Sequence, residues 1–323
     1  MNRTLYRAAA PAALLLLALT ACGGANEAEA EVGADGATTD TSSGEVLVDG
    51  SSTVQPLTAA AGELFREVSP DVNVSVATSG TGGGFEVFCQ GSTDISNASR
   101  PIKDEEAAAC ADAGIEFTEL RVATDALTVV VSADNDFIQC LTVDELGILW
   151  NPEAEGTVTT WDQVNPEFPA ETIELYGPGT DSGTFDYFTE EIGGDTGVSR
   201  TDFNASEDDN VIVQGVQGSP NALGYFGYTY YEENADTLKA VEIDNGDGCV
   251  APSAETAADG TYAPLARPLF IYVNNASFAD KTHVADFVKF YAENDGDVAE
   301  AAQFIPLNEE MAGELVDAVA AMG

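Results

Sequence analysis

Three short segments rich in glycine, serine and threonine stand directly before predicted helices, and each could hold an anion. Residues 177–188 read Gly-Pro-Gly-Thr-Asp-Ser-Gly-Thr-Phe-Asp-Tyr-Phe, residues 50–53 read Gly-Ser-Ser-Thr, and residues 79–84 read Ser-Gly-Thr-Gly-Gly-Gly. The start of a helix carries unpaired backbone N–H groups and partial positive charge, which favour anions. Glycine lets the backbone approach a ligand closely. Three such segments in one chain predict that loops converge on one tetrahedral oxyanion.

Strands must precede these loops to bring them together. Residues 46–48 and 174–176 read as short strands before the first and third loops, and residues 72–76 alternate valine with polar residues before the second. Residues 57–68 repeat apolar side chains at helical spacing, and Pro56 suits the first turn of that helix. Strands that alternate with helices predict an α/β fold with ligands at the carboxyl ends of strands.

The remaining periodic segments extend the same pattern. Apolar runs predict strands at residues 127–131 and 269–273, and helical spacing predicts helices at residues 141–150, 278–294 and 308–322. No internal repeat stands out.

The amino terminus has the pattern of an export signal. Arg3 and Arg7 precede an apolar run at residues 8–19 that is too short for a membrane span. The run ends in Leu-Thr-Ala-Cys, which resembles a bacterial lipobox and implies cleavage before Cys22 and lipid attachment to its sulfur. Residues 1–21 are therefore expected to be a lipoprotein signal peptide, and residues 22–43 an acidic flexible tether.

The charge balance limits the partners. The chain has 56 acidic residues against 11 lysines and arginines, and a formal net charge of −45. This argues against nucleic acid as a partner. Because salt screens exposed charges beyond about 8 Å, the local site decides whether an anion binds. The acidic surface fits either general solubility or a high-salt habitat.

Four cysteines follow Cys22, and an even number in an exported chain suggests two disulfides. Three pairings are possible. We favour Cys89–Cys110, which closes a short loop, and then Cys140–Cys249. Metal binding is the weaker interpretation, because the chain has no Cys-x-x-Cys and a single histidine.

With the loops placed, the chain resembles the periplasmic or lipid-anchored phosphate-binding proteins of phosphate ABC importers, in the periplasmic binding protein family. The matching segments span nearly the whole mature chain in the expected order: residues 49–56, 79–85, 94–102, 179–185 and 266–273. As a set they are specific, although each alone is not.

The resemblance implies an α/β, two-lobed periplasmic-binding-protein (type II) fold with the ligand in the cleft between the lobes. It implies a first lobe of residues 44–125 plus 226–323 and a second lobe of residues 126–225. It implies inorganic phosphate as ligand, an ABC permease as partner, attachment to the outer face of the cytoplasmic membrane through lipid at Cys22, and no cofactor or metal. A monomer is expected.

The resemblance also implies the site residues. These are Ser52, Thr53, Thr81, Ser182, Gly183 and Thr184, with Ser79 and Ser99 as further candidates. Each can donate through a hydroxyl or a backbone N–H group.

This sequence departs from the family pattern at two positions. Pro178 stands where the family has an arginine, and Ser99-Arg100 stands where it has a carboxylate. Arg100 could supply the missing cation, and Asp181 the missing carboxylate. A carboxylate matters because it accepts a hydrogen bond from the proton that phosphate still carries, and it repels fully ionised sulfate.

Other functions remain to be weighed against this one. The same loops would suit a receptor for sulfate, molybdate or tungstate, or a phosphate sensor or scavenger that has no permease. Gly-Thr-Asp-Ser-Gly superficially resembles the loop of a serine hydrolase with Ser182 as nucleophile. However, the sole histidine, His283, lies about 100 residues away in a helical pattern, so we expect no enzyme.

Overall fold

The computed structural model describes residues 42–180 and 182–323. The signal sequence, Cys22, most of the tether and Asp181 lie outside the described residues, so the predictions made for them stay predictions.

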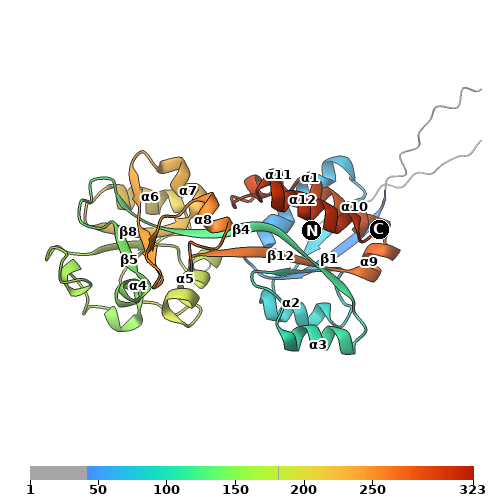
Figure 1. Ribbon diagram of the computed structural model, residues 1–323, viewed down its shortest axis with the longest axis horizontal. Coiled ribbons are helices and arrows are strands. Elements are labelled where there is room, and N and C mark those ends of the chain that lie inside the picture. Colours follow the sequence, from blue (N-terminus) through green and yellow to red (C-terminus); the bar gives the residue numbers. More distant parts are fainter. Residues whose placement is uncertain (1–41, 181) are drawn as a thin grey trace, which may run out of the picture. The chain divides into compact units, whose positions relative to one another are not determined.

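One large mixed sheet runs through the described chain (Figure 1). Its first five strands, in spatial order, are β2 (Val72–Val76), β1 (Gly44–Gly50), β3 (Ile95–Ala98), β12 (Ala266–Asn274) and β4 (Phe117–Ser132). The sheet continues through β8 (Ala222–Gly227), β6 (Glu174–Gly177) and β7 (Asn204–Ala205), and β9 (Leu238–Ala240) also pairs with β4. Because β1 is parallel to β2 and β3, the loops that follow these strands meet at one edge.

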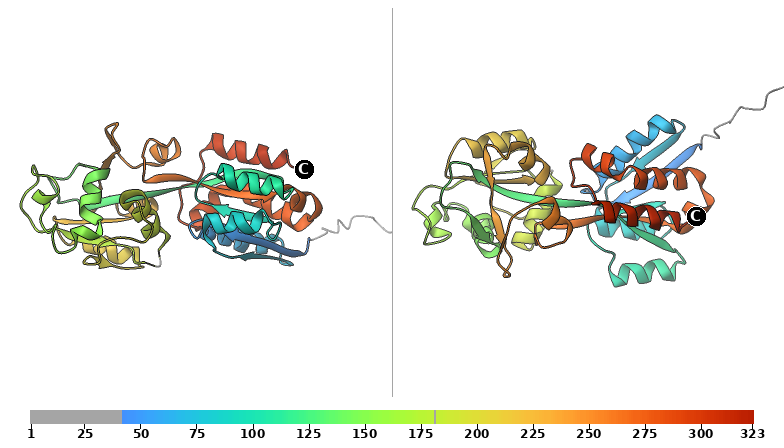
Figure 2. Two further views of the ribbon diagram at one scale, coloured as in Figure 1. Left: turned by 90° about the horizontal axis from the view of Figure 1, so that it is seen from below. Right: turned by 45° about the horizontal axis from the view of Figure 1, so that its top comes forward.

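The helices cover this sheet (Figures 1 and 2). They are α1 (Gln55–Val68), α2 (Gly80–Phe88), α3 (Asp104–Asp112), α4 (Val143–Trp150), α5 (Gly183–Gly193), α6 (Asp209–Gln217), α7 (Tyr228–Asn234), α8 (Ala254–Ala258), α9 (Asn275–Asp280), α10 (Thr282–Glu293), α11 (Asp295–Ala301) and α12 (Glu309–Ala320).

Two large hydrophobic cores lie along the sheet. The first core includes Val46, Leu57 and Leu269 together with α10 and α12, and the second includes Leu127, Trp161 and Tyr225. The long strand β4 takes part in both, since its residues 120, 122 and 123 belong to the first core and its residues 127, 129 and 131 to the second.

The segment before β12 packs differently from the division expected above. Val241, Ile243, Tyr262 and Leu265 are buried in the second core, although the expected first lobe contained residues 226–323. The physical reason is strand pairing. Strand β9 pairs with β4, and β10 (Glu242–Asp244) pairs with β5 (Cys140–Thr142) in a small sheet beside the second core.

The two cores are joined by β4 and β12, which run side by side as an antiparallel pair (Figure 1). Their register places Arg267 directly opposite Asp125. Partners opposite each other in a sheet point to the same face, so the pairing brings these two side chains together.

Three expected elements differ from the structure. Residues 80–84 are the first turns of α2 rather than a loop, and Gly84 is required because a Cβ there would lie 2.5 Å from Cα of Gly50. The predicted helix at residues 141–150 begins at Val143, after the short strand β5 (Cys140–Thr142). The predicted helix at residues 278–294 is two helices, which meet at the extended residue Lys281.

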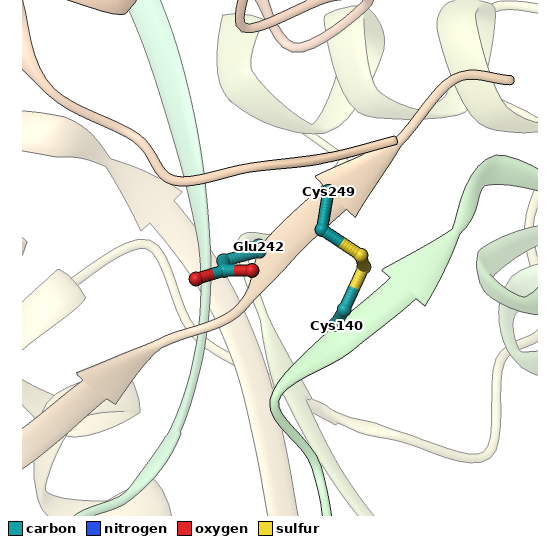
Figure 3. A group of neighbouring side chains, drawn as sticks. All are labelled: Cys140, Glu242 and Cys249. Carbon is teal, nitrogen blue, oxygen red and sulfur yellow. A yellow bond between two sulfur atoms is a disulfide. The ribbon is translucent and has the colours of Figure 1, made fainter. Parts of the chain in front are cut away.

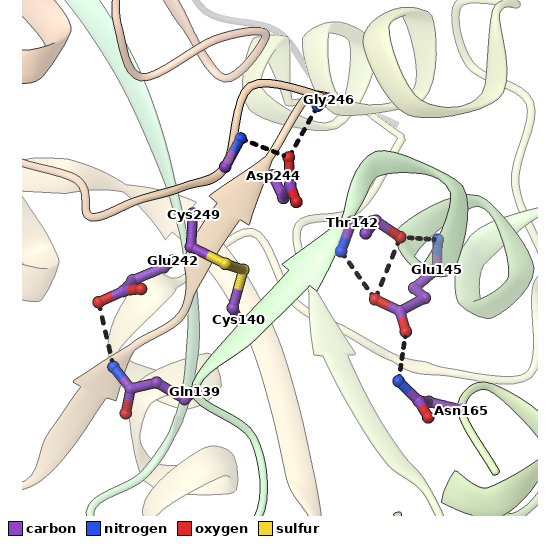
Figure 4. The surroundings of a disulfide bond; sticks show 10 residues. Gln139, Cys140, Thr142, Glu145, Asn165, Glu242, Asp244, Gly246 and Cys249 are labelled. Carbon is purple, nitrogen blue, oxygen red and sulfur yellow. Dashed lines mark hydrogen bonds between the residues drawn. A yellow bond between two sulfur atoms is a disulfide. The ribbon is translucent and has the colours of Figure 1, made fainter. Parts of the chain in front are cut away.

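Both favoured disulfides are present. Cys89–Cys110 is buried between α2 and α3, whereas Cys140–Cys249 joins β5 to β11 (Cys249–Val250) and Cys249 is exposed. These strands form a three-stranded sheet with β10 (Glu242–Asp244), whose Asp244 accepts backbone hydrogen bonds from Gly246 and Gly248 (Figure 4). The pairing therefore ties the segment before β12 to the second core.

Within the described part of the chain, no helix combines the length and apolar character that crossing a membrane requires.

Candidate anion-binding site

A cavity of about 440 Å³ brings the predicted loops together. The loop after β1, the start of α2 and the segment after β3 contribute Ser51, Ser52, Thr53, Gly80, Thr81, Gly82, Ser99, Arg100 and Pro101. Helix α5 and the segment after it contribute Gly183, Asp186, Tyr187, Glu190, Glu191 and Thr196, and β12 contributes Arg267 and Pro268. Six of the ten residues predicted as ligands therefore line one cavity.

The first loop leads from β1 into α1. Ser51 is buried and its N–H donates to the backbone oxygen of Asn97, which fixes the loop against β3. Ser52 is exposed and Thr53 is half-buried at the cavity. The residue at the helix cap is Val54, which has no side-chain oxygen to cap the first turn. The start of α1 is thus available to an anion.

The second loop leads into α2 and separates two of the predicted residues. Thr81 lines the cavity, and its Oγ1 accepts a hydrogen bond from the N–H of Ser99 at 3.2 Å and lies 3.1 Å from the Ser99 hydroxyl. Ser79 instead donates from both its N–H and its hydroxyl to Oδ1 of Asp49, each at 2.9 Å. The structure gives Ser79 a role in holding the loop rather than a place among the lining residues.

The third loop leads into α5. Ser182 caps this helix, because its Oγ accepts a hydrogen bond from the N–H of Thr184 at 3.2 Å. Gly183 lines the cavity, and a Cβ there would lie 3.4 Å from Oγ1 of Thr53. The starts of α1 and α5 therefore approach each other. Thr184 lines a separate hollow of about 150 Å³ together with Asp125 and Asp209.

Arg100 lines the cavity but already has a carboxylate partner. Its Nη1 and Nη2 donate to the two oxygens of Glu106 at 2.9 and 2.8 Å, and Nη1 also donates to the backbone oxygen of Pro101. The hydrogen bond to Arg100 holds the pKa of Glu106 below its usual value. The hydrogen bonds among the described residues leave the edge formed by Nε and Nη2 for a ligand.

Arg267 is a cavity residue that the sequence argument did not single out. Its Nε donates to Oδ2 of Asp125 at 3.2 Å, and its Nη2 donates to the hydroxyl of Thr53 at 3.0 Å. Its guanidinium carbon lies 3.5 Å from the centre of the Tyr187 ring. Arg267 occurred in a segment that carries the family resemblance, which is the one signal that could have pointed to it.

The surroundings of Arg267 are buried. Its side chain is 14% exposed and that of Asp125 is 10% exposed. Burial raises the pKa of Asp125, although Arg267 opposes this shift. Burial also raises the pKa of Tyr187, whose hydroxyl donates to the backbone oxygen of Pro264 at 2.7 Å. Arg267 is thus held by β4, by the loop before α1 and by α5.

Carboxylates of α5 face the same cavity. Asp186 and Glu190 are four residues apart, and Glu191 follows Tyr187 at the same spacing, so all reach one side of the helix. Burial, and then the charge of Glu190, raise the pKa of both Asp186 and Glu191. None of the three forms a salt bridge with another described residue.

One group of metal-ligating side chains occurs among the described residues, at Cys140, Glu242 and Cys249 (Figure 3). Their ligand atoms lie within 4.8 Å of one another. However, the two sulfur atoms are bonded to each other as a disulfide, so neither is a thiolate that could bind a metal ion.

Comparison with known proteins identifies relatives along most of the chain. A family model described as the PBP superfamily domain matches residues 35–295. Protein SphX from Synechocystis is 47% identical over 306 residues, which cover 95% of this chain and 87% of the relative. The phosphate-binding protein PstS from Staphylococcus saprophyticus is 45% identical over 292 residues, which cover 90% of this chain and 86% of the relative.

A solved structure agrees with these relatives. The crystal structure of "a possible phosphate binding protein" from Planctomyces limnophilus matches with a TM-score of 0.82 and 44% identity, and the match covers 87% of this chain and 99% of that chain. The fold described above is therefore shared with that protein over nearly its whole length.

Proposed function

Because the chain belongs to the PBP superfamily and, within it, to the PstS- and SphX-like phosphate-binding proteins, we propose that it captures inorganic phosphate outside the cytoplasm and delivers it to an ABC permease. The predicted two-lobed α/β fold of periplasmic binding proteins is confirmed. The observation that carries the proposal is the single cavity in which the starts of α1, α2 and α5 meet two arginines.

The protein is not an enzyme, since it belongs to a family of binding proteins and its relatives are phosphate-binding proteins. The contacts of Ser182 and His283, the two residues that a serine hydrolase would require here, are consistent with this conclusion. The Ser182 hydroxyl caps α5, and the ring of His283 lies so close to Gly44 that a Cβ on that glycine would approach its atoms to 2.6 Å.

We assign the lobes by their cores. The first lobe would contain β1 to β3 and the carboxyl-terminal helices, and the second would contain α4 to α6 with the segment that leads to β12. The strands β4 and β12 would act as the hinge. The start of α5 already approaches the first loop in this structure. Opening of the lobes would admit the anion, and closure would restore this approach, so that the dehydrated anion receives hydrogen bonds from both sides.

Each site residue has a defined task in this proposal. Backbone N–H groups near Thr53 and Gly183, the Thr53 hydroxyl, and whichever of the Thr81 and Ser99 hydroxyls does not donate to the other would donate to phosphate oxygens. Ser52, Ser182 and Thr184 would shape the loops and add donors as the lobes close. Ser79 would hold the second loop through Asp49.

The two arginines would present different edges to the anion. Arg100 uses its terminal nitrogens for Glu106 and keeps the edge with Nε, whereas Arg267 uses Nε for Asp125 and keeps its Nη1. Charge-assisted hydrogen bonds of this kind are short and strong. Asp125 also prevents the nearly buried Arg267 guanidinium from being unpaired before the ligand arrives.

Selectivity would depend on a carboxylate that accepts the proton of bound phosphate, and Asp181 is the residue proposed for this role. Titration calorimetry with phosphate, arsenate, sulfate and molybdate tests the assignment. We expect one phosphate per chain, competition by arsenate and little competition by sulfate. Equal affinities for sulfate and phosphate at about pH 8, where phosphate still keeps one proton, would contradict it.

We propose that a lipid on Cys22 anchors the protein, as a monomer, to the outer face of the cytoplasmic membrane. Two disulfides fit an oxidising compartment. Metabolic labelling with a fatty acid tests the anchor. The label should appear on the wild type and be absent from Cys22→Ala, and an unlabelled wild type would contradict the anchor without affecting phosphate binding.

A further inference from the structure

Gln303 has a backbone conformation that residues with a side chain rarely adopt. It lies between α11 and α12 with a φ of 61°, and no other non-glycine residue in the described ranges, 42–180 and 182–323, has a positive φ. The left-handed conformation costs free energy in a residue that has a Cβ, so the surrounding structure must hold it. Because Gln303 is exposed, burial in a core does not explain the conformation.

Two consecutive residues of α7 contact Gln303. The Thr229 hydroxyl donates to the backbone oxygen of Gln303 at 3.0 Å, and the Tyr230 hydroxyl donates to its side-chain Oε1 at 2.9 Å. Both distances are those of ordinary hydrogen bonds. Gln303 thus presents both of its oxygen atoms to one helix, and we call this pair of hydrogen bonds the clasp.

The clasp joins elements that belong to different lobes. Tyr230 packs against a hydrophobic cluster formed largely by α6 and β8, on the side of the second lobe. Ala302 and Phe304, the residues on either side of Gln303, pack against the first core. The clasp therefore connects the two lobes outside the strands β4 and β12 that were assigned as the hinge.

The clasp also lies next to the anion cavity. Its residues border the hollow of about 150 Å³ that Asp125 and Thr184 line as well. Thr184 belongs to the first turn of α5, which reaches the anion cavity at Gly183, and Asp125 is the partner of Arg267. The clasp is therefore on the side of the hinge strands where the cleft opens, and a rotation that opens the cleft also separates the clasp.

The first-lobe half of the clasp is attached to a hinge strand. Ile305 donates its N–H to the backbone oxygen of Thr124 in β4 at 3.1 Å, and its own backbone oxygen accepts from the N–H of Thr124 at 3.0 Å. Thr124 directly precedes Asp125. The segment 303–305 thus connects α7 to the strand position that holds Arg267.

We propose that Gln303 and Tyr230 are positioning residues for phosphate binding, because the clasp holds the lobes in the closed arrangement and slows release of the ligand. This inference rests on the proposed function. Neither residue is among the described residues that line the anion cavity, so each acts on phosphate only through the position of the lobes. A hydrogen bond is lost once its atoms separate beyond about 3.5 Å, so the clasp stabilises the closed form and not the open one.

Stopped-flow measurement of phosphate release tests this. Trp150 packs edge-on against Phe188 of α5 and supplies a fluorescence signal from the second lobe. Tyr230→Phe keeps the ring and removes only the hydroxyl that donates to Gln303. We expect phosphate release to become about two- to tenfold faster, the range for one neutral hydrogen bond, with little change in the association rate.

Tyr228→Phe is the matched control. It removes a hydroxyl from the same helix, but the partner of that hydroxyl is Glu232, four residues further along α7. No contact between the lobes is lost with it, so the control should release phosphate at the wild-type rate.

Variants of Gln303 separate the clasp from general stability. Gln303→Gly loses Oε1 but adopts the positive φ without strain, so release should accelerate as in Tyr230→Phe while the unfolding free energy in urea stays close to that of the wild type. Gln303→Glu keeps an acceptor at the same length and should release phosphate at about the wild-type rate. The double variant Tyr230→Phe with Gln303→Gly should release no faster than either single variant, because both changes remove the same hydrogen bond.

The outcomes are distinct. Wild-type release rates in both Tyr230→Phe and Gln303→Gly would overturn the clasp and leave phosphate binding intact. Equal acceleration in Tyr230→Phe and Tyr228→Phe would also overturn it, because the effect would then come from α7 alone and not from its contact with Gln303. A wild type that binds no phosphate would overturn the proposed function itself.

Discussion

The two arginine–carboxylate pairs beside the cavity use the same chemistry in opposite structural settings. Arg100 and Glu106 are six residues apart, and the arginine side chain is 32% exposed. Arg267 and Asp125 are 142 residues apart on two paired strands, and both side chains are nearly buried. The first pair orders the segment between β3 and α3, and the second links β12 to β4, the two strands that join the cores.

The difference lies in what each pair holds in place. Glu106 also accepts a hydrogen bond from the N–H of Lys103, so the local pair fastens the start of α3 to the corner after β3. Arg267 contacts Thr53 of the first loop and the ring of Tyr187 in α5. Loss of the hinge pair should therefore disturb binding and stability together, and loss of the local pair should mainly affect binding.

The largest effect is expected from Arg267→Ala. It removes charge-assisted hydrogen bonds to the anion and leaves Asp125 buried without its cation, so phosphate affinity and unfolding free energy should each fall by about 3 kcal/mol. Calorimetry and urea unfolding measure the two quantities. Arg267→Lys is the control, and it should recover part of the stability but little of the affinity, because an ammonium lacks the planar fork. An unchanged dissociation constant for the alanine variant would remove Arg267 from the site.

A smaller effect is expected from Arg100→Ala. Phosphate affinity should fall by about 1.5 kcal/mol, the lower end for a hydrogen bond to a charged group, because part of the guanidinium is already bonded to Glu106. Stability should change by less than about 1 kcal/mol, as for other exposed ion pairs. Equal losses of affinity in the Arg100 and Arg267 variants would contradict the contrast between the two pairs.

The same contrast explains what the sequence could reveal. Arg100 stands in one of the segments that carry the family resemblance, and the loops containing Thr53, Thr81 and Gly183 follow strands that periodicity predicts, so the sequence pointed to four residues that line the cavity. The partners of Arg267 are 142 and 214 residues away. The pairing of β4 with β12 brings Asp125 to Arg267, and the order β1, β3, β12 in the sheet brings the loop that contains Thr53. No spacing rule reaches across such separations.

Hydroxyl residues show a second limit of the sequence argument. Ser79 and Ser182 have the residue type and position of ligands, yet the structure assigns the Ser79 hydroxyl to Asp49 and uses the Ser182 hydroxyl as a helix cap. Serine before a helix serves either role, and the choice depends on where the neighbouring carboxylate or N–H lies. The start of α2 at Gly80 was missed because glycine disfavours a helix, whereas here Gly84 lies within α2 in close contact with Gly50.

Tyr187 tests whether the hinge arginine depends on its aromatic neighbour. Tyr187→Leu removes the ring beneath Arg267 and should weaken phosphate binding by about 1 kcal/mol. Tyr187→Phe keeps the ring and loses only the hydrogen bond to Pro264, so its affinity should stay close to wild type. Calorimetry compares the two variants. The same affinity in both would mean that the ring does not position the arginine.

The smallest effects concern pH, and here the two carboxylates should respond with opposite sign. The pKa of Glu106 is lowered by Arg100, so its contribution to stability is present above the ordinary value of 4.5 and is lost as the pH falls. The pKa of Asp125 is raised by burial, so its ionised form costs stability at neutral pH, and this cost disappears as the pH falls toward 3.8.

Urea unfolding of the wild type, Glu106→Gln and Asp125→Asn between about pH 6 and about pH 3.5 checks this. The amides keep an acceptor for the arginine and do not titrate in that range. The advantage of the wild type over Glu106→Gln should shrink by about 0.5–1 kcal/mol, the range for partly exposed ion pairs. Its stability relative to Asp125→Asn should instead rise on acidification. If both stability differences changed with pH in the same direction, the Arg267–Asp125 pair would hold its charges in the same way as the Arg100–Glu106 pair. The contrast between the two pairs would then be geometric rather than electrostatic.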